Sequence, residues 1–141
     1  YFKKKYYYTE LNIKFAPRLL SLANTSIDIS DGLFNDLNKL INKQKLSYRL
    51  YLKEVPISHN LKKLIDLKLL KKIDCISKGD DYQILFTAKP TKSNIIKKIG
   101  KTLGVKISKI GKICSPSYPS EIIDEKKAKI IPKNKGYYHS F

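Results

Sequence analysis

The chain has 141 residues, of which 29 are Lys or Arg and 12 are Asp or Glu, so its formal net charge at pH 7 is +17. This length suits one domain, and an apolar content of 42% is enough for a core, which excludes wholesale disorder. No apolar run approaches the roughly 18–20 residues that a membrane-spanning helix needs, and no apolar stretch follows the charged first residues. The sequence therefore predicts neither a membrane span nor a secretory signal.

The ends and the cysteines suggest a piece of a larger cytoplasmic protein. The sequence contains no Met, which favours a fragment of a longer chain. We expect the aromatic and basic residues 1–15 to be a linker from a missing N-terminal domain and residues 16–141 to form the domain that follows. Cys75 and Cys114 form no CxxC pair and have no nearby His, so we expect reduced thiols rather than a disulfide or a zinc site.

The surplus of positive charge would attract nucleic acid or an anionic membrane surface. However, only Arg18 and Arg49 are arginines, and arginine is the residue that makes bidentate phosphate and guanine contacts. The lysines are also spread along the whole chain. This pattern favours a solvated basic surface, and it makes nucleic acid and membranes unlikely partners.

The predicted elements alternate between helices and strands. Four helices are predicted. The first covers 17–24, with Pro17 in its first turn, and the second begins at Asp31, with Ser30 or Asp31 as its N-cap. The other two cover 59–72 and 91–103. Their apolar faces include Leu69 and Ile95, and Gly104 ends the last helix. Strands or extended segments are predicted at 26–30, 48–57, 81–87 and 105–113, with a hairpin over 122–131. The order predicts an α+β fold, an α/β sandwich in which helices flank a mixed sheet.

The sharpest local motif is the run from Asp28 to Gly32, with the sequence DISDG. Asp28 and Asp31 bracket Ser30 immediately before a helix, and hard divalent cations such as Mg²⁺ prefer carboxylate oxygens of this kind. The free amides of a helix start, the Ser30 hydroxyl and the small Gly32 suit a phosphate group. The alternative is an ordinary turn in which Asp31 caps the helix and Asp28 is solvated.

A second motif joins Gly79 to the adjacent acids Asp80 and Asp81. These acids predict a loop that binds a cationic or hydroxyl-bearing ligand. The alternative is an ordinary turn with no ligand. His59 and His139 are isolated, which favours surface or packed histidines over catalytic bases. Aromatic side chains near the C-terminus, at Tyr137, Tyr138 and Phe141, favour packing or stacking on a flat heterocycle.

Together these segments resemble thiamine-monophosphate kinase. Residues 26–33 with Asp36 and Leu37 resemble that family's IDxSDGL…DL segment, and residues 79–87 resemble its GGEDYELLFT segment. Two weaker likenesses are residues 107–113, similar to xTRIGxI, and residues 136–139, similar to the closing G-aromatic-x-H. The departures are Lys78 for the first glycine of the second segment, Asp80 for its glutamate and Gln83 for its last acid.

The resemblance implies the C-terminal domain of an ATP- and Mg²⁺-dependent kinase that converts thiamine monophosphate to thiamine diphosphate, with the fold of the C-terminal domain of aminoimidazole ribonucleotide synthetase. It implies metal binding by Asp28 and Asp31, ATP contact by Ser30, and substrate contact by Asp80 and Tyr137. No residue is implied as a nucleophile. It also implies that this piece is inactive without its N-terminal domain, which builds a homodimer in the full-length enzyme. The alternatives are a non-catalytic basic module for RNA or anionic surfaces, and another ATP-using member of the superfamily.

Overall fold

The computed structural model describes residues 1–8, 13–41 and 45–131. The helices differ in length from five to eleven residues, and they are α1 (Phe2–Tyr7), α2 (Ala16–Leu22), α3 (Leu33–Ile41), α4 (His59–Asp66), α5 (Lys72–Ile76) and α6 (Ser93–Leu103). The strands are β1 (Thr25–Asp28), β2 (Ser47–Tyr51), β3 (Ile84–Thr87), β4 (Gly111–Cys114), β5 (Glu121–Ile123) and β6 (Lys129–Ile130), and 3-10 turns cover Leu52–Glu54 (η1) and Pro90–Lys92 (η2). No helix of these residues is long and apolar enough to cross a membrane.

The strands form two separate sheets. β1 and β3 make an antiparallel pair in which Asp28 faces Ile84. The other four strands lie in the order β4-β2-β5-β6, with β2 parallel to β5 and the other pairs antiparallel. The mixed sheet and its flanking helices confirm the predicted fold class.

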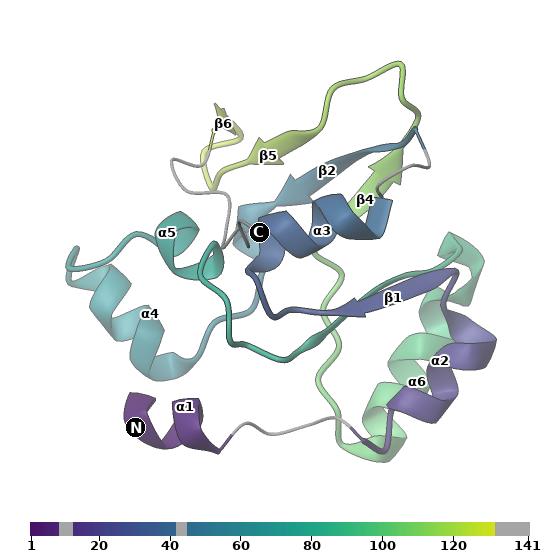
Figure 1. Cartoon of the computed structure of the whole chain (residues 1–141), viewed down its shortest axis with the longest axis horizontal. Helices are drawn as coiled ribbons and strands as arrows, with labels where there is room; N and C mark the ends of the chain where they lie inside the picture. Colours follow the sequence, from purple (N-terminus) through teal and green to yellow (C-terminus); the bar gives the residue numbers. More distant parts are fainter. Residues whose placement is uncertain (9–12, 42–44, 132–141) are drawn as a thin grey trace, which may run out of the picture.

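Helix α3 connects the two sheets through one shared core. In Figure 1 the helix crosses between the β1–β3 pair and the four-stranded sheet. Its apolar side chains recur every three or four residues and are all buried, which is the pattern of a helix face turned to a core. The core cluster comprises Leu33, Phe34, Leu37, Leu40 and Ile41 of α3 with Tyr48, Leu50, Leu52, Val55, Ile76, Leu85 and Ile122. Burial of this apolar surface is the main force that holds the sheets to the helix.

Several predicted bounds are wrong. The strand predicted over 48–57 ends at Tyr51, because a 3-10 turn places Leu52 and Val55, three residues apart, both in the core. The strand predicted over 105–113 forms only from Gly111. Its ladder with β2 starts where Gly111 faces Leu50, and the Ile110 carbonyl accepts a hydrogen bond from the amide of Tyr51 (2.8 Å), the last residue of β2.

The helix predicted over 59–72 divides into α4 and α5. Lys68 adopts a left-handed backbone (φ 59°) that ends α4, and the amides of Lys68 and Leu69 donate back to the carbonyls of Ile65 and Leu64. Leu69 is therefore exposed instead of facing inward, and Ile95 of α6 is half exposed. Helix α6 itself, stopped by left-handed Gly104, and the β5–β6 hairpin are confirmed.

The segment 1–15 contains helix α1, which the sequence pattern did not predict. Its role as a linker between domains stays a prediction, as does the division of the chain at residue 16.

Candidate functional site

The two acidic motifs lie side by side. The β1–β3 pair places Asp28 opposite Ile84, and backbone hydrogen bonds continue beyond the strand ends. The Ile29 amide donates to the Gln83 carbonyl (2.9 Å), the Tyr82 amide to the Ile29 carbonyl (2.8 Å), and the Asp80 amide to the Ser30 carbonyl (2.9 Å). Residues 28–32 and 77–83 therefore form one structural unit, which we call the acidic junction.

Two glycines make this close approach possible. A Cβ added at Gly79 would lie 1.9 Å from the Ser30 carbonyl oxygen, and one added at Gly32 would lie 2.3 Å from the Ser77 carbonyl oxygen. Gly32 also adopts φ +103°, a conformation that side chains disfavour. From the sequence we expect Gly32 to let a ligand approach the backbone, but in the structure the approaching group is the Ser77 main chain.

A buried carboxylate shapes the first loop. Asp36 has 0% relative exposure, and its Oδ2 accepts hydrogen bonds from the amides of Ser30 (3.0 Å) and Asp31 (2.9 Å). Charge-assisted bonds of this kind are about twice as strong as neutral ones. The sequence indicates Asp36 only through the family resemblance. The available signal was an acid at helical spacing within an apolar face, where a carboxylate needs buried partners.

The predicted N-cap is wrong. Helix α3 begins at Leu33, and the Asp36 amide donates to the Gly32 carbonyl (3.0 Å), which places Gly32 at the cap position. The Asp36 side chain reaches back to the amides of Ser30 and Asp31, so the loop is fixed from within the helix. Gly32, and not Ser30 or Asp31, therefore occupies the cap position.

Asp28 and Asp31 lie on the same loop with different surroundings. Asp28 ends β1 and is exposed, whereas the Asp31 side chain is 14% exposed and forms an ion pair with Lys39. The Lys39 ammonium also contacts Asp36 Oδ1 (3.1 Å). Asp31 raises the pKa of Lys39, with a further contribution from Asp36, while burial acts in the opposite direction.

Asp28 and Asp31 offer the donor type that a hard divalent cation takes. Carboxylate oxygens are the ligands that Mg²⁺ takes, and the Lys39 ammonium already occupies a cation position at Asp31. Within the described residues, no group of three or more His, Cys, Asp or Glu side chains is arranged to hold a metal ion. Two carboxylates suffice where phosphate oxygens and water complete the shell.

The second loop has a special backbone. Asp80 and Tyr82 both have positive φ, 67° and 48°, and the Tyr82 hydroxyl lies 3.3 Å from Asp80 Oδ1. Asp80 and Asp81 are both exposed. Although Asp81 is exposed as a residue, desolvation of its carboxyl group raises its pKa, and the neighbouring Asp80 charge adds to this effect. The loop therefore presents two acidic side chains beside the first motif.

The remaining candidate site residues are not part of the acidic junction. His59 begins α4 behind the Ser58 cap and is exposed, in agreement with a surface histidine. Tyr137, Tyr138, His139 and Phe141 lie outside the described residues. Substrate contact by Tyr137 therefore remains a prediction.

Comparison with curated proteins yields thiamine-monophosphate kinases, while no family model matches the chain. The chain is 33% identical over 123 residues to thiamine-monophosphate kinase of Buchnera aphidicola from Acyrthosiphon pisum and 35% identical over 125 residues to that from Schizaphis graminum. Each alignment covers 86% of this chain and 37% of the relative. This chain is homologous to part of thiamine-monophosphate kinase. It spans little more than a third of the length of these relatives.

Solved structures of thiamine-monophosphate kinases share the fold. The enzyme from Stenotrophomonas maltophilia K279a superposes with a TM-score of 0.70 and 25% identity, over 84% of this chain and 36% of that one. A structure described as AaThiL complexed with AMPPCP and TMP gives a TM-score of 0.71 over 96% of this chain and 40% of that one. At 23% identity, the second comparison supports the fold alone.

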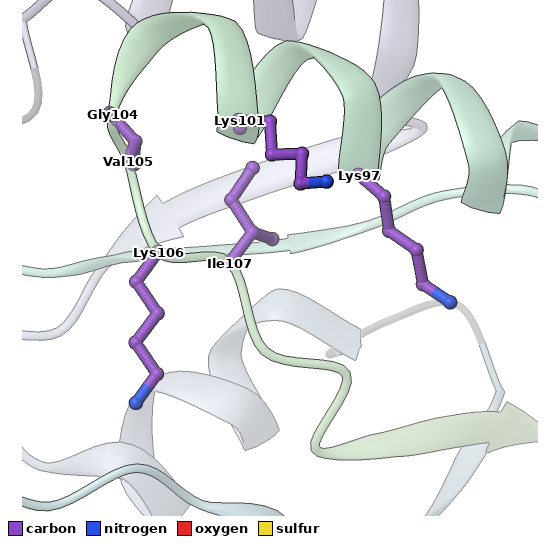
Figure 2. A pocket seen from close by; sticks show the side chains of 7 residues that line it. Lys97, Lys101, Gly104, Val105, Lys106 and Ile107 are labelled. Atoms are coloured by element: carbon purple, nitrogen blue, oxygen red, sulfur yellow. The ribbon is translucent and has the colours of Figure 1, made fainter.

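A hollow of about 470 Å³ lies at the end of α6, apart from the acidic junction. Figure 2 shows Lys97 and Lys101 on α6 and Lys106 on the following segment, with Ile107 between them and Val105 next to Gly104. None of the carboxylates of the acidic junction lines it. Its lysines are exposed, and the hollow does not enter the proposal below.

Proposed function

We propose that this chain is the C-terminal domain of an ATP- and Mg²⁺-dependent kinase that converts thiamine monophosphate to thiamine diphosphate. The observation that carries the proposal is the acidic junction, in which backbone hydrogen bonds unite the two most specific motifs. Homology to thiamine-monophosphate kinases over 86% of the chain supports the same assignment. The complex of AaThiL with AMPPCP and TMP supports a nucleotide and thiamine monophosphate as ligands.

In this proposal Asp28 and Asp31 hold Mg²⁺ at the polyphosphate of ATP, and Ser30 donates a hydrogen bond to a phosphate oxygen. Bound Mg²⁺ would neutralise charge that builds up on the phosphates. Asp36 keeps the Ser30 and Asp31 amides in place through its two hydrogen bonds. The loop enters the reaction already ordered, which is what phosphoryl transfer mainly requires of a protein.

The second loop positions the acceptor. Asp80 would contact the cationic heterocycle of thiamine monophosphate, and Tyr137 would stack on it. An oxygen of the acceptor phosphate then attacks the γ-phosphorus of ATP, a new P–O bond forms, and the bond to the β,γ-bridging oxygen breaks to release ADP. Both reactants bring their own phosphates, so no residue of this chain acts as a nucleophile.

The rest of the active site would come from an N-terminal domain. The chain spans 37% of its curated relatives, and the acidic junction offers only part of a metal shell. We therefore expect the isolated chain to lack kinase activity and the full-length protein to be a homodimer.

A chimera tests this function. This chain would replace the matching 37% of the kinase from Buchnera aphidicola of Acyrthosiphon pisum, and thiamine diphosphate would be measured with ATP, Mg²⁺ and thiamine monophosphate. We expect the chimera to be active. In Asp31→Asn we expect the kinase activity to fall on the order of 100-fold, because the substitution removes one charged metal ligand. The matched control is Asp66→Asn, which removes an exposed carboxylate at the end of α4.

Two results would contradict the proposal. One is a folded chimera without thiamine-monophosphate kinase activity, and the other is full activity in Asp31→Asn. The net charge of +17 supports the alternative of an RNA-binding module. Saturable, sequence-selective RNA binding by an inactive chimera would favour that alternative, whereas phosphorylation of a different substrate would assign another activity within the superfamily.

A further inference from the structure

Lys39 contacts the acidic junction, and the proposed function gives it no role. It lies in the last turn of α3, and its ammonium contacts the carboxylates of both Asp31 and Asp36. The Lys39 side chain is 44% exposed, whereas the side chains of Asp31 and Asp36 are 14% and 1% exposed. The ammonium of Lys39 thus lies at the solvent side of two shielded carboxylates.

The two carboxylates depend on Lys39 to different degrees. Asp36 accepts two backbone hydrogen bonds through Oδ2, so it keeps partners when Lys39 leaves. The contact with Asp31 instead occupies Oδ2 of a carboxylate proposed to bind metal. A divalent ion at this oxygen would repel the ammonium across a short distance, so we expect the ion to displace the ammonium.

We propose that Lys39 is a built-in competitor for the divalent-cation site, which neutralises Asp31 when no metal is bound and leaves when metal binds. This inference rests on the metal role of Asp31 in the proposed function. Exchange of one cation for another keeps a positive charge beside the partly shielded Asp31 carboxylate in both states. The metal therefore binds more weakly than it would to Asp31 alone.

The test measures metal affinity rather than kinase activity. The full chain would be titrated with Mn²⁺, and the free ion would be followed by electron paramagnetic resonance. We expect Lys39→Gln to bind Mn²⁺ about tenfold more tightly than the original chain, because one neighbouring charge is removed. Lys98→Gln, on the exposed surface of α6, removes the same charge from another element and should leave the affinity unchanged.

A second pair of variants separates this inference from the proposed function. Asp31→Asn should weaken Mn²⁺ binding at least about tenfold, and Asp31→Asn with Lys39→Gln should bind like Asp31→Asn alone. If Asp31→Asn weakens binding while Lys39→Gln has no effect, the competitor role is overturned and the metal role stands. If no Asp31-dependent binding occurs in any variant, both are overturned.

A measurement on the unsubstituted chain covers the case in which Lys39→Gln does not fold. The Lys39 ammonium resonance, assigned by its loss in Lys39→Arg, would be followed by NMR during Mg²⁺ addition. We expect it to shift with the midpoint of metal binding and to stay fixed in Asp31→Asn. A resonance that does not move while Asp31 binds metal would overturn the inference.

Discussion

The four-stranded sheet and the acidic junction are held together by different forces. In the sheet, side chains such as Leu50 (1% exposed) and Ile122 (5% exposed) pack against α3, and apolar burial fixes the strands. In the junction, three backbone hydrogen bonds, two glycines and the Asp36 carboxylate position the loops. A loop whose side chains must stay polar and open cannot be held by apolar burial, so the main chain supplies the contacts.

Helix α3 joins these two regions. Its apolar residues lie in the core, while Asp36, on the same buried side, holds the loop that precedes the helix. The four-stranded sheet therefore stabilises the fold, and the acidic junction positions the acidic side chains. Variants in the two regions should therefore differ in which backbone amides lose protection from hydrogen exchange, even where they lower the free energy of unfolding by the same amount.

The largest expected effects come from Asp36→Ala and Leu50→Ala, which we expect to lower the free energy of unfolding by about 3 kcal/mol each. Asp36→Ala leaves the Ser30 and Asp31 amides without their acceptor, whereas Leu50→Ala leaves a cavity. Urea unfolding would measure the size of both effects. Hydrogen exchange should show lost protection at Ser30 and Asp31 in the first variant and across β2 and β4 in the second.

Equal exchange patterns in the two variants would break the comparison, because they would mean that sheet and junction open as one unit. Asp36→Asn refines the test. It retains one oxygen for the two backbone donors, so its cost should be smaller than that of Asp36→Ala.

The next effect is that of Gly79→Ala, which we expect to cost about 2 kcal/mol. Its Cβ would lie 1.9 Å from the Ser30 carbonyl oxygen, so the two loops must separate and the hydrogen bond from the Asp80 amide must lengthen. Gly104→Ala is the matched control, since a Cβ there meets nothing within 4 Å and only the left-handed backbone is strained. That strain costs about 1 kcal/mol.

Metal affinity sharpens the same test. Gly79→Ala should weaken Mn²⁺ binding, while Gly104→Ala, at the far end of α6, should not. A Gly79→Ala chain as stable as the original would show that the loops do not need their close approach.

The sequence predicted those parts of the molecule that depend on local pattern. Four features appear where the sequence indicates: the apolar repeat of α3, Pro17 in the first turn of α2, Gly104 at the end of α6 and the β5–β6 hairpin. The family resemblance also selected the two segments that the fold brings together. These features rest on helical spacing, proline and glycine geometry, or motif identity.

The errors arise where a tertiary partner decides the outcome. Residues 105–109 alternate like a strand but lie outside the ladder with β2, and Leu69 follows a helical repeat that Lys68 interrupts. The sequence placed Ser30 or Asp31 at the helix cap because both have suitable oxygens. In the structure, Asp36 bonds to the amides of both residues, a contact that depends on how the loop folds back over the helix.

The smallest expected effect concerns pH and Asp81. Desolvation, with a contribution from Asp80, raises the pKa of Asp81 in the folded chain above its ordinary value of 3.8, so folding favours the protonated form. This contribution to stability is fully present below pH 3.8 and is lost as pH rises through the raised pKa. At pH 7, Asp81→Asn should therefore raise the free energy of unfolding by less than about 1 kcal/mol, because the residue is exposed, and the melting temperature should rise slightly. At pH 3 the substitution should have no such effect.

The control for this effect is again Asp66→Asn, because both substitutions add the same positive increment to a chain of net charge +17. Melting temperatures of the two variants measured from pH 3 to pH 7 should diverge only above the ordinary aspartate range, with Asp81→Asn the more stable. Parallel curves would mean that water reaches the Asp81 carboxyl freely. The acidic junction would then position its second loop without any cost from shielding a charge, and its difference from the sheet would lie in backbone contacts alone.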